Sequence, residues 1–554
     1  MVLQDRKRNI LRINEIARVL IKYGFDSFAQ KISDKNIGFL PVNKIIADEI
    51  PSDANVRLRY VLEELGTTFI KLGQTLSTYP ELIGFELADE LSKLQESAPI
   101  DDFESVKQTI ENEFSKPLED IFEEFSKEPI ASASIGQVHT AYLNNKFVAV
   151  KVQHPGIEEK VYSDIKIMHT IAKRLDNRVE QSKSYNLPGL VDVFEKDMVK
   201  ELNYEFEAMN AIHIGDILKD DDVYIPEVYL DYTTSKVLTM EYLDGVSLNT
   251  VIKSDDGVYD KREIALQGAD SFFKQILIHG FYHADPHPGN IFVLKDNMVA
   301  FVDFGMVGHL DNDLREDLAK LFIFISEGDA KLLTKQLVYM GIVDDDSVNY
   351  KEIEYEVMLL LDRYYGIQFN DVSGVLRGLV RDDVLNKYGV VLPRDLMMVI
   401  RTISMIDDVG RELDPTFNTT AIVKPYALKM LMDMVQPKRL LTKTTEKVMD
   451  FQHLWKKLPK SLLNFFEVVD EGHLNIAIDD DEIDRISVII SRIVNELVIA
   501  IITAAMLIGS SLIMLAENGV KFLDYPILGF IGFTFSLVLG VILIIIIIKR
   551  GNYL

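Results

Sequence analysis

The spacing of apolar side chains predicts a mostly helical chain with a strand-rich stretch in its first half. From Leu58 to Leu94 the apolar residues recur every three or four positions, as in amphipathic helices. After Pro129 the pattern changes to short apolar runs, the clearest of which is the strand 147–150. Residues 226–240 are expected to form paired strands, and the period from 314 to about 466 is again helical. The pattern therefore predicts a helical extension, a strand-containing lobe and a helical lobe.

Two long uncharged segments close the chain. They cover 497–516, with 20 residues, and 527–548, with 22 residues, and either could cross a hydrocarbon core of ~30 Å. The alternative is a buried core helix. The short connector predicts a hairpin with both flanks on one side. Lys521 is the one basic residue in the connector, whereas the flanks carry four basic residues, Arg485, Arg492, Lys549 and Arg550. This distribution of positive charge favours cytosolic flanks. We therefore expect a cell-membrane protein with two spans and a cytoplasmic N-terminal part.

Small residues recur at intervals of four in both uncharged segments, namely Ala505 and Gly509, then Gly532, Ser536 and Gly540. Such residues allow close helix approach in a membrane. They could pack the hairpin or join two copies of the chain as a homodimer, and packing within the hairpin is the simpler expectation.

Charged residues interrupt the apolar positions near the N-terminus, so no secretory signal is expected there. The segment 1–50 is predicted to be an amphipathic helix that lies on an anionic membrane or packs on the protein. The remaining boundaries follow the pattern: a helical extension at 51–125, an N-lobe at 126–245, a helical C-lobe with its extension at 246–470, an acidic linker at 471–496, and the hairpin at 497–554.

Composition narrows the possible functions. The 554 residues include 59 basic and 86 acidic side chains, a formal net charge of −27, which argues against a nucleic-acid partner. There is no cysteine, so disulfides, thiolate metal sites and cysteine nucleophiles are excluded.

The stretch from His283 to Gly305 carries the strongest chemical signal. Asp285 is followed five residues later by Asn290, and Asp303 then begins an Asp-Phe-Gly sequence. This is the spacing of the metal and phosphate centre of protein kinases. Asp285 would orient or deprotonate the attacking hydroxyl, while Asn290 and Asp303 would hold Mg²⁺ on the ATP phosphates. A merely polar turn would leave this placement a coincidence.

An upstream loop of small residues and a lysine complete this pattern. Small side chains let backbone N–H groups approach phosphates closely. The loop consists of Ala131, Ser132, Ala133, Ser134, Ile135, Gly136, Gln137 and Val138. The strand 147–150 ends at Lys151, as in the Val-Ala-Ile-Lys strand of kinases; the alternative is an exposed charge at a strand end. The lysine needs a carboxylate partner, for which the segment 201–208 offers candidates. Backbone groups of a hinge at Glu241 and Leu243 could meet adenine.

Together with Lys71-x-Gly73-Gln74 and the Glu201 helix, the loop, Lys151 and the stretch 283–290 resemble the UbiB family of atypical kinases, also called aarF-domain-containing (ADCK) proteins. The resemblance runs from roughly residue 50 to the C-terminal hairpin. It implies an α+β, protein-kinase-like two-lobed fold with an N-terminal helical extension and a C-terminal two-helix transmembrane hairpin. It also implies ATP and Mg²⁺ as cofactors.

The resemblance further implies specific roles. Lys71 and Gln74 would belong to a cover over the site where a protein substrate would dock, and Glu201 would help to hold that cover. Lys151 and Glu207 would form the ion pair. Members of the family resemble slow, lipid-responsive ATPases that support the biosynthesis of isoprenoid quinones such as ubiquinone. One departure is Asn203, because the family's Glu-x-Asp reads Glu-Leu-Asn here, which removes a charge that would attract Lys71.

The leading hypothesis is thus a membrane-anchored, kinase-fold ATPase or phosphotransferase. Its partners would be the lipid bilayer and an isoprenoid lipid or quinone precursor, or the proteins that make it. One alternative is an ordinary Ser/Thr protein kinase, which a cover over the docking surface disfavours. The other is a nucleotide-binding pseudokinase scaffold without turnover, for which only Asn203 speaks.

Overall fold

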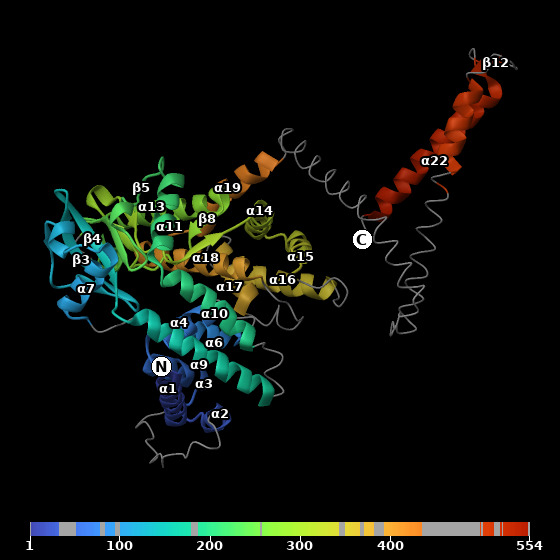
Figure 1. Ribbon diagram of the computed structural model, residues 1–554. Coiled ribbons are helices and arrows are strands. Elements are labelled where there is room, and N and C mark those ends of the chain that lie inside the picture. The colour runs from blue at the N-terminus through green and yellow to red at the C-terminus, as the bar shows by residue number, and fades with distance from the viewer. Residues whose placement is uncertain are drawn as a thin grey trace. The chain divides into compact units, whose positions relative to one another are not determined.

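Figure 1 shows the computed structural model of the chain. The structure describes residues 2–32, 51–77, 83–94, 100–178, 187–254, 257–342, 350–365, 371–381, 393–434, 499, 502–514, 521–522 and 525–551. The chain divides into two compact units, Met1–Leu441 and Thr442–Leu554, and each is described by itself. The acidic linker expected at 471–496 lies outside the described residues.

The N-terminal helices pack on the rest of the first unit. They are α1 (Val2–Lys22), α2 (Asp26–Ile32), α3 (Ala54–Leu65), α4 (Thr67–Ser77) and α6 (Phe85–Leu91). On α1, Ile13 and Ile16 are buried, and the Arg12 guanidinium donates to the Asp164 carboxylate on α9 (Ile157–Arg178) at 2.9 Å. Of the two placements expected for the amphipathic segment, its apolar face therefore takes packing on the protein.

A five-stranded sheet forms the N-lobe, covered by α7 (Phe103–Phe114) on one side and reached through the short α8 (Leu118–Ile121). The path runs β1-β3-β4-β6, with β2 added beside β3. The strands are β1 (Glu124–Phe125), β2 (Ala131–Ser132), β3 (Gly136–Leu143), β4 (Lys146–Gln153) and β6 (Val237–Glu241). Antiparallel pairing places Val138 of β3 opposite Lys151 of β4. The alternation on β4, where Val148, Val150 and Val152 are fully buried, leaves Lys151 on the other face.

Three helices follow the β3–β4 hairpin before the chain returns to the sheet: α9 (Ile157–Arg178), α10 (Leu187–Glu201) and α11 (Tyr204–Ile217). Apolar residues of α9, α10 and α11 share one core with α1, α3, α4 and β6. The N-terminal helices are thus built into the N-lobe.

The C-lobe begins with small sheets that carry the predicted catalytic stretch. One sheet has the order β5-β10-β9-β7, and a second pairs β11 with β8. These strands are β5 (Val223–Tyr224), β7 (Val246–Ser247), β8 (Phe281–His283), β9 (Ile291–Val293), β10 (Val299–Phe301) and β11 (Val307–His309).

Helices surround these strands and continue the lobe. They are α12 (Leu248–Lys253), α13 (Lys261–Phe273), the π-helical turn Lys274–His279, α14 (Asn312–Glu327), α15 (Ala330–Tyr339), α16 (Tyr350–Tyr365), α17 (Val372–Arg381), α18 (Arg394–Leu413) and α19 (Thr419–Met434). Phe272 of α13, Ile403 of α18 and Val423 of α19 lie in one buried cluster. The first unit therefore has the helix-rich α+β organisation expected from the pattern.

In the second unit, α22 (Ile527–Gly551) follows the short pair β12 (Lys521–Phe522) and β13 (Tyr525–Pro526). A Cβ placed on Gly532 of α22 would lie 3.0 Å from Cβ of Ser510, so these two segments touch through small residues. The predicted span 497–516 lies partly outside the described residues, whereas 527–548 lies within α22. Within the described part of the chain, no helix combines the length and apolar character needed to cross a bilayer, so the expected hairpin spans are not confirmed.

Candidate active site

Two short strands bring Asn290 and Asp303 to the same end of a hairpin. Asn290 directly precedes β9, Asp303 follows β10 by two residues, and Phe301 pairs with Ile291 across the hairpin. The Val302 N–H donates to the Asn290 carbonyl at 2.9 Å. Asp303 has a φ of 61°, in the left-handed region where aspartate is one of the tolerated residues. The backbone thus turns sharply at the predicted metal ligand.

His283 joins the catalytic loop to the strand that precedes Asp303. The buried imidazole accepts the Asp285 N–H at Nδ1 (3.1 Å) and lies 3.1 Å from the Val302 carbonyl at Nε2. Because a carbonyl can only accept, Nε2 carries the hydrogen. The sequence analysis assigned His283 no role, although it stands two residues before Asp285.

Asn290 and Asp285 are in direct contact. The Asn290 amide nitrogen donates to Asp285 Oδ2 at 3.0 Å and approaches the Asp285 carbonyl at 3.3 Å. With the nitrogen committed to Asp285, the amide oxygen remains as the group that can meet a cation. An amide oxygen and the carboxylate of Asp303 are hard oxygen donors, which fits Mg²⁺ with further positions left for phosphate and water.

Lys151 lies between two carboxylates. Its ammonium is 2.9 Å from both Oε atoms of Glu207 on α11 and 3.7 Å from Oδ1 of Asp303. The Lys151 and Glu207 side chains are 12% and 7% exposed, whereas the Asp303 side chain is 47% exposed. The pair is therefore enclosed while Asp303 opens toward solvent.

Burial and charge shift these groups in different directions. Burial raises the pKa of Glu207 to about 7, against the opposing charge of Lys151. The Lys151 ammonium has the largest effect on the pKa of Asp303 and lowers it. Burial opposes this effect and Lys71 adds to it, so the pKa of Asp303 stays below its ordinary value. For Lys151, burial alone would lower the pKa, but the charges of Asp303 and Glu207 outweigh burial and raise it. An ammonium beside an ionised Asp303 is the stable state.

Tyr204, at the first turn of α11, lies next to Lys151. The Lys151 ammonium lies 5.1 Å from the centre of its ring, within the range of a cation–π contact. The Tyr204 hydroxyl is buried and has no hydrogen-bond partner among the residues that the structure describes. A Cβ on Gly136 would come within 2.3 Å of this hydroxyl and 2.5 Å of the Val152 carbonyl, so only glycine fits at that point of the loop.

The helix α4 holds the predicted cover residues. Lys71 forms an ion pair with Glu201 at the C-terminal end of α10. The Gln74 side-chain amide donates to the Leu94 carbonyl at 3.1 Å. A Cβ on Gly73 would lie 2.2 Å from a methyl of Leu94, so this glycine lets α4 pack closely. Lys71 faces the site through its charge on Asp303, whereas the described bond of Gln74 ties α4 to the chain after α6.

Asn203 has a local structural role. It precedes α11, and its side-chain oxygen accepts the Glu205 N–H at 2.9 Å, which makes it the N-cap of the helix that carries Glu207. Asparagine and aspartate serve equally well as N-caps. The amide therefore preserves the start of α11 despite the loss of charge.

The remaining predicted nucleotide contacts lie on the N-lobe. In the small-residue loop, Ser134 and Ile135 are buried and the Ala133 N–H donates to the Gly136 carbonyl at 2.8 Å. At the hinge, the Glu241 carboxylate accepts the Tyr224 hydroxyl at 2.8 Å, and Leu243 is 9% exposed. The Glu241 side chain is thus engaged within the protein, and backbone groups are what the hinge can offer to a base.

Three family models match the chain in sequence. They are the ABC1 atypical kinase-like domain at 93–337, the UbiB helical domain at 357–418, and the ABC1/UbiB kinase-like C-terminal domain at 481–549. An uncharacterised protein of Synechocystis, sll1770, is 30% identical over 77% of this chain and 74% of its own length. The chain belongs to the ABC1/UbiB family of atypical kinase-like proteins.

Other relatives match over almost the whole length of the chain. The protein named as uncharacterised in the hydrogenase 1 5′ region of Clostridium pasteurianum is 28% identical over 98% of this chain and all of its own. The probable protein kinase UbiB of Xanthomonas axonopodis pv. citri is 28% identical over 91% of this chain and 93% of its own. The kinase-like fold of the first unit follows from membership of this family.

The UbiB helical domain contributes Arg401 to the neighbourhood of Asp285. Thr402 on α18 donates to the Ala284 carbonyl at 3.2 Å, and the Arg401 guanidinium donates to the Ser77 hydroxyl at the end of α4 at 3.2 Å. Burial lowers the pKa of Arg401, and the charge of Asp285 partly offsets this effect. Arg401 lies in the stretch from 314 to about 466 for which a helical pattern was expected, and that pattern gave no sign of a functional role.

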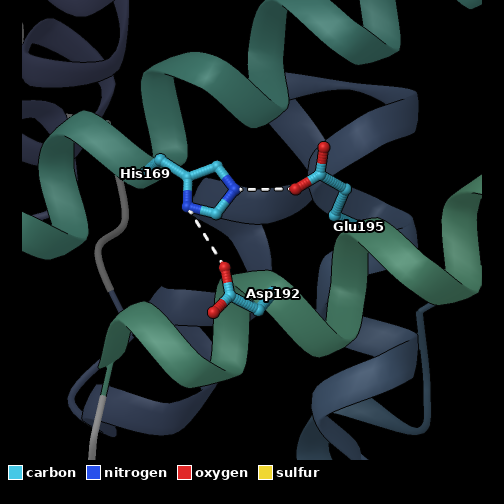
Figure 2. Close-up of side chains that lie close together, drawn as sticks. All are labelled: His169, Asp192 and Glu195. Carbon is cyan, nitrogen blue, oxygen red and sulfur yellow. Dashed lines mark hydrogen bonds and ion pairs between the residues drawn. The ribbon is translucent and has the colours of Figure 1, made fainter.

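A separate cluster lies between α9 and α10, as Figure 2 shows. The His169 ring has its Nε2 atom 2.9 Å from Glu195 Oε2 and its Nδ1 atom 3.7 Å from Asp192 Oδ1. Among the described residues, this is the one group of three with the side-chain types and spacing for a metal ion. Both ring nitrogens face carboxylates, so the cluster links α9 to α10, the helix that ends at Glu201.

Proposed function

We propose that this ABC1/UbiB protein binds MgATP and cleaves its terminal phosphate bond, acting as an ATPase or phosphotransferase. One observation carries the proposal: Lys151 lies 2.9 Å from Glu207 and 3.7 Å from Asp303, with Asp303 the open member of the three. An ammonium held by one carboxylate beside a second, exposed carboxylate can serve a triphosphate and its cation together.

In this proposal each residue has one task. Lys151 binds the phosphates and Glu207 holds it in place. Asp303 and the side-chain oxygen of Asn290 bind Mg²⁺, which neutralises charge on the phosphates. Asp285 accepts the proton of the attacking hydroxyl or water, and its contact with Asn290 at 3.0 Å aligns it with the metal.

The acceptor is proposed to be water or a small or lipid molecule rather than a range of proteins. The support is the helix α4, which is bonded both to α10 through Lys71 and Glu201 and to α18 through Ser77 and Arg401. A protein substrate would have to displace a helix tied at two points. This contact set disfavours an ordinary Ser/Thr protein kinase, and Asn203, the residue that speaks for a scaffold without turnover, caps α11.

We further propose that the protein supports isoprenoid quinone or lipid biosynthesis at the cell membrane, anchored through 497–516 and 527–548, with the N-terminal unit in the cytoplasm. The support is the family resemblance and the absence of charged residues in both segments. Sodium carbonate extraction of cell membranes tests the anchor: a protein released like a peripheral control would overturn it. Lipid extracts of a deletion strain, with rescue by wild type but not by Asp285→Asn, test the pathway.

ATP turnover with and without Mg²⁺ tests the central proposal. Asp303→Asn is expected to lower kcat by about a hundredfold or more, because it removes a charged metal ligand. Asp296→Asn is a matched control: Asp296 is an exposed aspartate with a φ of 60°, against 61° for Asp303. Turnover that survives Asp303→Asn would refute the metal assignment. Nucleotide binding without hydrolysis would favour the scaffold, and phosphate transfer to many unrelated proteins would favour a general kinase.

A further inference from the structure

His154 makes three contacts with the neighbourhood of the small-residue loop. It follows β4, three residues after Lys151, and its side chain is 10% exposed. The ring lies with Nδ1 2.5 Å from Asp101 Oδ2 and Nε2 2.9 Å from the Ala133 carbonyl. Its backbone N–H donates to the Ile135 carbonyl at 2.9 Å. One residue therefore holds the loop at two carbonyls, those of Ala133 and Ile135.

The hydrogen-bond partners define how the ring is used. A carboxylate oxygen and a carbonyl oxygen are both acceptors, so the His154 ring lies between two acceptors. His139, on the neighbouring strand β3, is a contrast. Its Nδ1 atom lies 2.8 Å from the Ser126 carbonyl and its Nε2 atom 2.9 Å from the Gln137 amide nitrogen, which can donate. Burial lowers the pKa of His139, as suits a neutral core ring, whereas His154 bridges two acceptors.

Fixing the carbonyls also fixes the N–H groups of the loop. In a planar trans peptide, the C=O of one residue and the N–H of the next point in opposite directions. When the carbonyls of Ala133 and Ile135 point at His154, the N–H groups of Ser134 and Gly136 point away from it. Carbonyl oxygens repel phosphate oxygens, whereas N–H groups attract them. The direction in which His154 holds these two peptides therefore decides which edge of the loop an anion meets.

Asp101 secures the same loop from its other end. Its N–H donates to the Gln137 side-chain oxygen at 2.9 Å, and its carboxylate holds the His154 ring. Gln137 is fully buried at the start of β3. The ring is thus held against a residue that is itself bonded to the far side of the loop, and it cannot turn away without breaking the contact with Asp101.

We propose that His154 is a positioning residue for the nucleotide phosphates. Its hydrogen bonds hold the carbonyls of Ala133 and Ile135 toward His154, so that the N–H groups of the loop point toward the triphosphate. This inference rests on the proposed function of the site in binding MgATP. It adds a determinant of phosphate affinity that touches neither the phosphates nor the metal.

The test is equilibrium binding of MgATP and of adenosine to the intact protein, with wild type, His154→Ala and His154→Gln. Loss of one hydrogen bond to the loop should raise the Kd for MgATP about tenfold in His154→Ala. Adenosine carries no phosphate, so its Kd should stay within about twofold of the wild-type value. Glutamine can still donate to the Ala133 carbonyl, and it should restore most of the affinity for MgATP.

The outcomes separate cleanly. Wild-type affinity for MgATP in a folded His154→Ala protein would overturn the inference and leave the proposed function intact. Equal loss of MgATP and adenosine binding in His154→Ala would assign His154 a structural role and would also overturn the inference. If His154→Ala does not fold, His154→Gln decides: a folded His154→Gln that has lost affinity for both MgATP and adenosine would overturn the inference as well. Failure of wild type to bind MgATP would overturn the proposed function and, with it, this inference.

Discussion

Replacing Glu207 by glutamine tests the geometry around Lys151 most directly. At an effective dielectric constant of 20, opposite charges at the observed Lys151–Glu207 and Lys151–Asp303 separations attract by about 6 and about 4 kcal/mol respectively. The two attractions are comparable, so Lys151 should pair with Asp303 once Glu207 has lost its charge. The lysine then neutralises a metal ligand instead of reaching the phosphates. A hydrogen bond to a charged group contributes about 1.5–3 kcal/mol, so kcat/KM for MgATP should fall about ten- to a hundredfold.

The pH dependence gives this prediction its sign. Burial raises the pKa of Glu207 to about 7, so the carboxyl loses its charge as the pH falls through neutrality. About nine-tenths of the wild-type protein carries the ionised carboxyl at pH 8 and about one-tenth at pH 6. Wild-type kcat/KM, which reports groups of the free enzyme, should therefore fall between pH 8 and pH 6. Glu207→Gln has no such group and should be flatter, so the two proteins should converge at low pH.

The assay is steady-state ATP turnover with saturating Mg²⁺ from pH 6 to pH 8, for wild type, Glu207→Gln and Glu205→Gln. Glu205 lies on the same helix but is exposed, so its variant should follow the wild-type profile. A constant ratio of wild type to Glu207→Gln across this range would refute the assigned protonation. Wild-type activity in Glu207→Gln at pH 8 would refute the ion pair's role altogether.

Three further predictions concern stability. Asp407 is fully buried and accepts from Arg377 and Arg411, each at 2.8 Å, so Asp407→Asn should cost about 3–5 kcal/mol and lower the melting temperature; an unchanged value would show the network to be dispensable. Asn203→Ala should cost about 1 kcal/mol by urea midpoint through loss of the N-cap, whereas Asn203→Asp should not; equal losses would argue against capping. The Tyr204 hydroxyl is buried with no partner in the described part of the chain, so Tyr204→Phe should be neutral or stabilise the protein by up to about 1 kcal/mol in thermal melts. A large loss of stability would mean that the hydroxyl has a partner.

Local sequence predicted the parts of the site that stand close together along the chain. Asp285 and Asn290 are five residues apart, and Lys151 lies in a strand whose alternation is readable from its valines, although that strand continues to Gln153 rather than ending at Lys151. These predictions need only a turn and a strand, and both depend on the choice of neighbouring residues. The helical N-terminal extension and the strand-containing lobe were predictable for the same reason.

Contacts between distant segments were not predictable in this way. Ser77 and Arg401 are 324 positions apart, and no pattern near either residue announces the other. The role proposed for His154 depends on the direction of two carbonyls in the loop between β2 and β3, and the residues next to His154 do not predict that direction. Asn203 is different: an asparagine before a helix whose first turn is acidic is a local N-cap signal, so its capping role was readable from the sequence alone.

The bonds that α18 makes with the catalytic loop bear on how the protein can be dissected. A fragment cut at the end of the matched kinase-like domain, residue 337, would lack Thr402 and Arg401 and would strip Ile403 from a shared core. It would leave the Ala284 carbonyl, which directly precedes the catalytic aspartate, without its Thr402 donor and would expose the apolar residues that pack on α18. We expect such a fragment to aggregate on expression, whereas one that runs from the first residue through α19 should behave as an autonomous body in solution. The smallest piece worth purifying is therefore set by α18, a helix that lies beyond the matched kinase-like domain.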